Sequence, residues 1–341
     1  MSRLTIIAVT DAATAKTILE QGFDLVNGKV QAIEAFGLSL LVAAKPKKSL
    51  ISGLKRKQAL NYIVEIQRLL EAFMTFGPVL AAVRGASLRD ETEGLGLLAS
   101  SHRTLRETLS GYGHKWQYQI VVRWQPREVL RAHAHLPEIA EAGSDNALGR
   151  RGLGKAIQQA METLRREKAM HFRKQLAAVT DDIVDEALDG PDMVGNFTVL
   201  IAPDQAAALD AVVEAIDASM PDQLLIKFIG PYPPASFAGV ALERFSKSDI
   251  RSAGSLLGVE PFGRADELRT AYLKYMKRHH PDVASLAGHQ CDDAADHSDR
   301  AARAYRMLKA LTEIQGNQII ADRNGAVVAH VERADEARSA A

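Results

Sequence analysis

Three prolines within four residues, between positions 231 and 234, restrict the fold of this chain more than any other feature. They follow the apolar run QLLIKFIG at 223–230, which has the length and composition of a buried strand. Because a proline fixes φ at about −65° and has no N–H to donate, such a segment cannot extend a helix or a hydrogen-bonded ladder. We predict that the strand ends at residue 230 and continues as a rigid, polyproline-like corner that holds Tyr232 and Phe237 in fixed directions.

Upstream of this corner, apolar periodicity predicts strands that alternate with helices. The clearest strand is HKWQYQIVVRW at 114–124, in which aromatic and aliphatic residues occupy every second position. One face of its sheet should therefore be buried and the other partly exposed to solvent. Residues 29–44 are expected to form one bent strand or a pair. The other expected strands lie at 3–9, 78–85 and 196–201, and the expected helices at 11–21, 54–76, 87–110, 127–141, 152–188 and 204–218.

The expected helix at 152–188 has an uneven charge distribution. Basic residues crowd its first half, and acidic residues from Asp181 to Asp189 crowd its second half. This order opposes the helix macrodipole, so the stability of an isolated helix does not explain it. Two interpretations stay open: a solvated helix face, or docking of the basic half onto an acidic partner.

A second constraint comes from His280-Pro281-Asp282, which closes a basic amphipathic helix and opens a polar loop. At helical spacing the apolar and aromatic residues of this helix fall on one stripe, with basic residues on the other side. After the loop, the segment RAARAYRMLKAL repeats the helical spacing. The stripe consists of Leu268, Tyr272, Tyr275, Met276 and His279.

This helix–loop–helix resembles a J-domain, the module by which DnaJ-type co-chaperones engage DnaK-type chaperones. Leu257-Gly258-Val259, the run from Glu267 to Lys274, and Ala304-Tyr305 match motifs of that family. The resemblance implies that the basic helix and the tripeptide contact the chaperone. The implied contacts are Arg269, Tyr272, Lys274, Lys277, His280, Pro281 and Asp282.

The segment also departs from the J-domain pattern. Ala253 and Gly254 replace an aromatic pair that is usual on the first helix, and Leu273 stands where a cation is usual. Two other interpretations therefore stay open. One is a J-like fold without chaperone coupling, and the other is a helical hairpin in which the tripeptide is only a turn and His280 caps the helix.

The proline corner resembles a motif of the gas vesicle accessory proteins GvpF and GvpL, in which a strand is followed by G-P-[WY]-P-P-Y-S-F. Ala235 departs from that motif. The similarity continues upstream in weaker form and covers about residues 1–245, including a strand that ends at Trp124. An alternative is that the motif residues only form a turn that ends a sheet. The matching residues are Gly230, Pro231, Tyr232, Pro233, Pro234, Ser236 and Phe237.

Together the two resemblances imply a non-enzymatic gas vesicle assembly protein that needs no cofactor. It would bind the coat protein and other accessory proteins during nucleation or growth of the shell. It would also recruit a DnaK-type chaperone through its His-Pro-Asp motif. Coat subunits expose apolar surface before assembly, and such surface must be kept from aggregating. The alternative is a general DnaJ-type co-chaperone for unfolded clients.

Composition limits the partners and the compartment. The formal net charge is +0, so no global field attracts the chain to nucleic acid or to a membrane surface. The single cysteine, Cys291, excludes an internal disulfide and suits a reducing compartment. The N-terminal apolar run is too short for a signal peptide, and no stretch has the length of a membrane span. We expect a cytoplasmic protein that is associated with gas vesicles.

Three patterns imitate chemical or nucleic-acid sites. Residues 149–155 fit GxxxxGK, but Ala156 stands where a phosphate-binding loop needs Ser or Thr for Mg²⁺, and no strand precedes the pattern. The histidines around Cys291 lack the paired-cysteine spacing of a zinc site. The basic run at 45–57 lacks the interleaved aromatic residues of a nucleic-acid surface. No constellation argues for catalysis.

The expected fold class is α+β: two α/β sandwich-like domains joined by a long helix, followed by an all-α J-domain-like helical hairpin. The expected domains are an N-terminal domain at 1–125 and a helical linker with a second domain at 126–245. The J-like segment follows at 250–315, and a hairpin with a flexible tail at 316–341. The signal for that hairpin is Asn324-Gly325 between two apolar runs.

Overall fold

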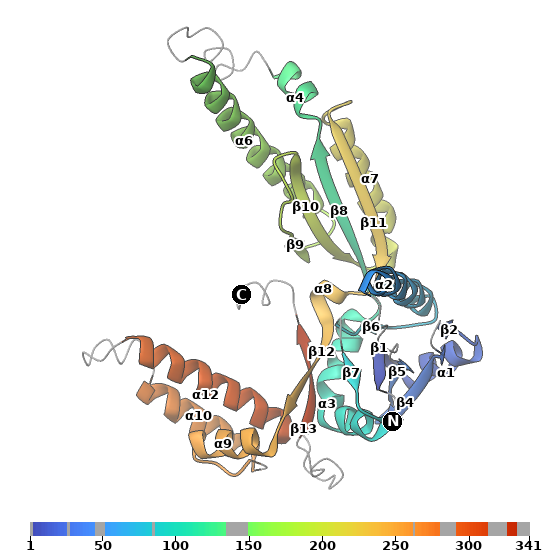
Figure 1. Cartoon of the computed structure of the whole chain (residues 1–341), viewed down its shortest axis with the longest axis vertical. Helices are drawn as coiled ribbons and strands as arrows, with labels where there is room; N and C mark the ends of the chain where they lie inside the picture. The colour runs from blue at the N-terminus through green and yellow to red at the C-terminus, as the bar shows by residue number, and fades with distance from the viewer. Residues whose placement is uncertain are drawn as a thin grey trace. The chain divides into compact units, whose positions relative to one another are not determined.

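The computed structural model describes residues 3–25, 28–44, 52–83, 86–133, 149–261, 263–279, 291–312 and 326–332. The chain forms two compact units (Figure 1). The first unit contains Met1–Gly113 and Ala238–Glu332, and the second contains His114–Phe237. The first unit is therefore discontinuous in sequence.

A sheet forms the centre of the first unit. Its strands are β1 (Leu4–Asp11), β4 (Gln31–Ala35), β5 (Leu38–Ala44), β6 (Leu80–Ala81) and β7 (Ser87–Leu88). Two separate two-stranded ladders are formed by β12 (Gly239–Phe245) with β13 (Ala326–Glu332) and by β2 (Asp24–Leu25) with β3 (Gly28–Lys29). The order in the central sheet is β4-β5-β1-β6, β7 also pairs with β1, and all of these pairs are antiparallel. A parallel bridge from Ala82 to Val240 brings β12 beside β6, and β12 pairs in turn with β13.

Residues 29–44 include a strand pair rather than one bent strand. Ala35 and Leu38 are opposite each other, and Phe36 and Gly37 between them have positive φ values of 56° and 73°. Two successive left-handed residues form the tight turn whose twist matches a β-hairpin. The glycine that interrupts the apolar run is therefore the turn.

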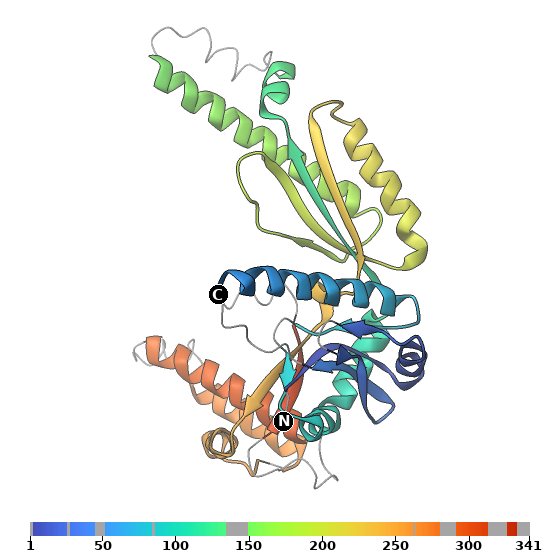
Figure 2. The ribbon, with the colours of Figure 1, turned by 45° about the vertical axis from the view of Figure 1, so that its right-hand side comes forward.

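Helices cover both faces of this sheet (Figure 2). α1 (Ala12–Glu20) and α2 (Ser52–Met74) pack on one face, where Phe73 is fully buried. α3 (Glu91–Tyr112) packs on the other face, where Leu97 is fully buried. The apolar spacing of the sequence explains these helices, because it supplies each with one stripe that must be covered.

In its described residues, the second unit is a four-stranded antiparallel sheet with the helices α6 (Gly149–Leu176) and α7 (Ala206–Ala218) on one face. Its elements are β8 (Trp116–Trp124), α4 (Pro126–Ala132), α6, β9 (Ile183–Asp185), β10 (Met193–Ile201), the 3₁₀ turn η1 (Pro203–Gln205), α7, β11 (Leu224–Tyr232) and α8 (Ala235–Ala238). The strand order is β11-β8-β10-β9. With the helices between them, these strands follow the ferredoxin-like βαββαβ pattern.

The expected one-sided burial of β8 is confirmed. Ile120 and Val122 are fully buried against α6 and α7, whereas Gln119 and Arg123 on the other face are half-buried. Gln117 is an exception, because it lies on the polar face and is only 8% exposed.

The predicted helix at 152–188 is wrong in its second half. α6 ends at Leu176, and the chain then adds β9 to the sheet. The Thr180 hydroxyl donates to the Leu200 carbonyl at 2.8 Å, which fixes the approach to the strand. Ile183 and Val184 are β-branched, so they favour a strand even though the apolar spacing continues that of the helix.

The acidic residues of this region pair with cations from neighbouring elements. Lys115 Nζ lies 2.9 Å from an oxygen of Asp182, and Arg173 Nε lies 2.9 Å from one of Asp185. The charge order therefore does not belong to a single helix. Arg173 and Lys174 in the last turn of α6 agree with the macrodipole rather than oppose it.

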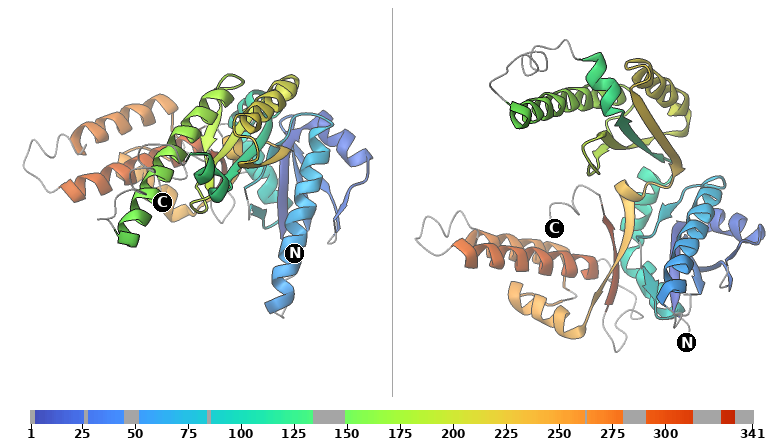
Figure 3. Two further views of the ribbon diagram at one scale, coloured as in Figure 1. Left: turned by 90° about the horizontal axis from the view of Figure 1, so that it is seen from above. Right: turned by 45° about the horizontal axis from the view of Figure 1, so that its top comes forward.

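In the described part of the segment between the paired strands β12 and β13, the chain forms the helices α9 (Lys247–Leu257), α10 (Ala265–His279) and α12 (Cys291–Thr312). We call residues 247–312 the helical insert. α10 and α12 lie side by side, and α9 packs against α12 (Figure 3). Leu268, Ala301 and Leu308 are buried in its core, and Tyr272 and Tyr275 pack on that core, as the helical stripes predict.

Of the hairpin expected around Asn324-Gly325, the structure describes only the residues after the turn, which form β13. β13 pairs with β12, and its other edge is occupied by α3. The Ser100 hydroxyl donates to the Val327 carbonyl at 2.7 Å, and the Ala329 N–H donates to the Ser101 hydroxyl at 2.8 Å. Residues 313–325 lie outside the described residues.

Candidate functional site

The proline corner is an extension of β11. The predicted end of the strand at residue 230 is two residues early, because the pairing shifts register after Ile229 and Tyr232 still pairs with Gln117. Gly230 has a φ of +142°, and a Cβ there would lie 2.7 Å from Tyr118 Cδ1 and 2.8 Å from the Gln117 carbonyl oxygen. Only glycine fits this position. The Gly230–Pro231 peptide bond is cis.

The side chain of Gln117 makes hydrogen bonds to Ser236, which follows the last proline of the corner. Its side-chain oxygen accepts from the Ser236 N–H at 2.8 Å, and its Nε2 donates to the Ser236 hydroxyl at 3.1 Å. Pro233, Pro234 and Phe237 are buried, and Tyr232 is half-buried. The contacts of the motif residues are thus largely within the fold. Sequence reasoning missed Gln117; its place on the polar face between two aromatic residues gave no sign of burial.

The outer side of α10 contrasts with this corner. Among the expected chaperone contacts, Arg269, Lys274 and Lys277 are exposed, while Tyr272 stacks on Tyr305 at a ring distance of 4.4 Å. The structure thus divides the expected contacts on α10 into exposed cations and a ring that packs on the insert core. The remaining expected contacts lie outside the described residues: His280, Pro281 and Asp282.

Gly254, one of the departures from the J-domain pattern, has a packing role. A Cβ at this position would lie 2.8 Å from the Val259 carbonyl oxygen and 3.0 Å from Pro261 Cγ. The turn after α9, which begins at the left-handed Gly258, therefore folds back directly onto the helix. Ala253 is buried in the core of the insert. The small residues let the turn approach α9 closely.

A pocket of about 860 Å³ lies between the end of α9 and α10. Its lining combines the backbone of Leu257–Glu260 with both charge signs, from Asp266 and Glu267 to Lys274 and Arg278. The pocket is open to solvent. Its mixed charge favours neither an anion nor a cation.

Two histidines and a tyrosine meet at the end of α10. The Tyr275 hydroxyl lies 3.0 Å from His297 Nδ1. The His279 ring is tilted against the Tyr275 ring at a centroid distance of 4.4 Å and stacks on the His297 ring at 5.4 Å. Within the described residues, no group of three or more His, Cys, Asp or Glu side chains is placed to hold a metal ion. His280 and His289, which the sequence also brings into this region, lie outside them.

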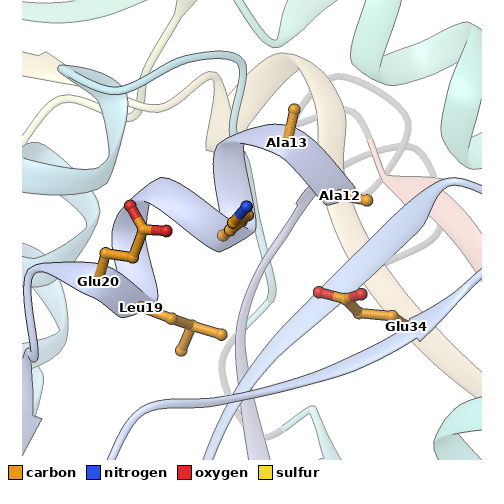
Figure 4. A pocket seen from close by; sticks show the side chains of 6 residues that line it. Ala12, Ala13, Leu19, Glu20 and Glu34 are labelled. Atoms are coloured by element: carbon orange, nitrogen blue, oxygen red, sulfur yellow. The ribbon is translucent and has the colours of Figure 1, made fainter.

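The GxxxxGK pattern is part of a helix. Residues 149–155 form the first two turns of α6 rather than a loop after a strand, so their backbone does not form a phosphate-binding loop. A second hollow of about 610 Å³ beside α1 is lined by Ala12, Lys16, Glu20 and Glu34, among others (Figure 4). Its lining holds no serine, threonine, cysteine or histidine. Among the described helices, none is both long and apolar enough to span a membrane.

Glu93 joins α3 to the strand that leads into the helical insert. Its two carboxylate oxygens accept from Arg244 Nε at 2.9 Å and from Arg244 Nη2 at 3.2 Å, and its Oε2 accepts from the Arg89 N–H at 2.6 Å. Burial alone would raise the pKa of the Glu93 carboxyl. Its bonds and ion pairs with Arg244 and Arg89 outweigh burial and hold that pKa below its ordinary value of 4.5.

Comparisons with known proteins find one matching family and similar solved structures. A family model described as gas vesicle synthesis protein GvpL/GvpF matches residues 6–239. The crystal structure of GvpF from Anabaena sp. PCC7120 is similar with a TM-score of 0.56 and 18% identity, over 69% of this chain and 97% of that one. GvpF from Microcystis aeruginosa is similar with a TM-score of 0.52 and 19% identity, over 69% and 98%.

No curated protein sequence matches the chain. At these identities the two crystal structures show a shared fold. The family model extends over more than half of the chain and ends at residue 239, where β12 begins. The chain belongs to the gas vesicle GvpL/GvpF family.

Proposed function

We propose that this protein is a non-enzymatic accessory protein of gas vesicle assembly. It binds the coat protein or other accessory proteins while the shell is nucleated or grows. The observation that carries the proposal is the family match over residues 6–239, and the fold shared with two GvpF proteins supports it. Because Pro233, Pro234 and Phe237 of the proline corner are buried and its Ser236 is bonded to Gln117 of β8, we assign partner binding to other surfaces of the two units.

The helical insert leads to the second part of this proposal, which is that the protein recruits a DnaK-type chaperone. Two features support it: the insert has its own apolar core, and α10 presents Arg269, Lys274 and Lys277 to solvent. Exposed cations on one helix suit an acidic partner surface and mainly set orientation and association rate. α10 ends at His279, immediately before the His-Pro-Asp tripeptide.

The alternative is a general co-chaperone that acts on any unfolded client. It draws on the same insert and differs only in what the two units bind. A pull-down with purified coat protein, compared with an unrelated unfolded protein, separates the two. We expect the coat protein to be retained and the unrelated client to be lost; equal retention of both would favour the general co-chaperone.

The strand pairing provides a way to remove the insert alone. Phe245 and Ala326 are opposite each other in the β12–β13 ladder, so an Asn-Gly turn can replace residues 246–325 and still close the ladder. We expect the shortened protein to bind coat protein and to lose any stimulation of ATP turnover by a DnaK-type chaperone. His280→Gln in the full chain should have the same effect on turnover. Unchanged stimulation by the shortened protein would contradict the recruitment of a chaperone by the insert.

A further inference from the structure

β11 lies at one edge of the second unit's sheet, and among the described residues no strand pairs with its outer side. The ladder shows which backbone groups face outward. The Gln125 N–H donates to the Gln223 carbonyl at 2.8 Å, and the register stays in phase up to Ile229. Because bonded residues alternate in an antiparallel ladder, every second residue of β11 points its N–H and C=O away from β8. These residues are Leu224, Ile226 and Phe228.

The two edge strands of this sheet differ in how well they are protected from pairing with another chain. β9, at the opposite edge, has only three residues, and Arg173 pairs with Asp185 at its end. Short length and charge are the usual devices that prevent an edge from pairing with another chain. β11 has nine residues, and its single charge is Lys227. Leu225 is 58% exposed and Phe228 38% exposed, on opposite faces of the strand. The β11 edge therefore lacks the protection of β9.

The helix α7, which packs beside β11, is acidic, so this edge favours a positively charged partner. Asp210, Glu214 and Asp217 are exposed along α7, and no Lys or Arg occurs between residues 203 and 223. Burial, and then the charge of Asp210, raises the pKa of Tyr118, which stacks on Phe228 at 5.0 Å. α7 also contacts β11, so the helix that carries this acidic row lies beside the exposed strand.

We propose that β11 accepts an extended segment of a vesicle shell protein, with apolar residues at alternate positions and basic residues beside them. The outward N–H and C=O groups would bond the segment's backbone, and Leu225 and Phe228 would contact its apolar side chains. This inference rests on the proposed function and assigns the surface that performs it. A second copy of this chain fits less well, because pairing β11 with itself would bring two acidic α7 helices together.

Hydrogen exchange of the full protein tests the backbone bonds directly. The probes are overlapping synthetic peptides that cover the coat protein. In the free protein, the amides of the outward residues 224, 226 and 228 should exchange fast, and those of 225, 227 and 229 slowly. A peptide with alternating apolar residues and nearby lysine or arginine should slow only the outward set. If no peptide slows these amides, or if raised protein concentration alone slows them, the proposal is overturned.

A side-chain variant gives an independent readout. Leu225→Lys places a cation on the exposed edge and should weaken binding of the same peptide by roughly tenfold, because apolar contact is lost and basic groups repel. Met170→Lys is the matched control, since Met170 is 66% exposed on α6 and lies on no strand edge. Equal weakening by both variants would contradict the assignment. A deletion strain that still forms vesicles would instead contradict the proposed function, whatever the exchange data show.

Discussion

The proline corner at 230–237 and the outer face of α10 differ in what their side chains contact. At the corner, Gly230 packs against Tyr118, and Ser236 is bonded twice to Gln117. On α10, the cations Arg269, Lys274 and Lys277 project into solvent. The corner is therefore maintained by the fold itself, whereas the cations on α10 are available to a partner. A motif can identify a family through its structural role and leave recognition to less conspicuous residues.

The largest effect should come from Gly230→Ala. The variant forces a left-handed φ on alanine and places its Cβ against Tyr118 and the Gln117 carbonyl, so the free energy of unfolding should fall by about 3 kcal/mol. Urea unfolding measures the change. Gly154→Ala is the matched control in the same unit, because nothing lies within 4 Å of a Cβ there, and it should gain about 0.5–1 kcal/mol. Similar midpoints for both variants would show that the corner is not close-packed.

Gln117→Ala should have the next largest effect. It removes both bonds to Ser236 and leaves the backbone N–H of the half-buried Ser236 without its partner, at a cost of about 2 kcal/mol in unfolding free energy. Gln119→Ala is the comparison, because Gln119 is half-buried and makes one bond, at 2.9 Å to Asn196. Thermal unfolding of the two proteins measures the difference. A larger loss for the Gln119 variant would contradict the role given to Gln117.

Arg244→Ala tests the ion pair between Glu93 of α3 and Arg244 of β12, the strand that leads into the insert. At neutral pH it should cost about 1–2 kcal/mol, because the Glu93 carboxylate loses a charged partner. The pKa of Glu93 is lowered in the folded state, so this stabilisation is present above the ordinary value of 4.5 and is lost as the pH falls through the folded value. When the free energies of unfolding of the wild type and the variant are measured from pH 7 downward, the difference between them should therefore vanish below about pH 4.5. A difference that stays constant with pH would contradict the ion pair.

The smallest effect on stability should come from the exposed side of α10. Lys277→Glu should change the free energy of unfolding by less than about 0.5 kcal/mol, since the side chain is exposed. The same change should reduce stimulation of a DnaK-type chaperone if the insert has that role. Lys174→Glu, at an exposed position of α6, is the control and should leave stimulation unchanged. Equal stimulation by both variants would count against the expected contact.

Sequence patterns located most of the elements that local periodicity defines. The alternation in 116–124 and the stripe from Leu268 to Met276 are both confirmed, because each depends on which face of one element is buried. The family resemblance was confirmed over 6–239 for a similar reason: its proline motif is short, local and specific.

Local sequence patterns could not predict which distant segments of the chain pair with each other. The end of α6 was missed because Ile183 and Val184 prolong its apolar spacing, and the strand becomes favourable only beside β10. The Asn-Gly signal did not reveal that Ser100 and Ser101 occupy one edge of β13 while β12 occupies the other. Gln117 was missed because its partner, Ser236, is 119 residues away.

Vesicle formation in a strain that lacks this gene tests the central claim most directly. Light microscopy of living cells, with flotation as a second readout, shows whether refractile vesicles are present. We predict that they are absent from the deletion strain and return with the full chain, and that the Gly230→Ala protein restores them poorly. Cells that form vesicles and float normally without this protein would contradict its role in gas vesicle assembly.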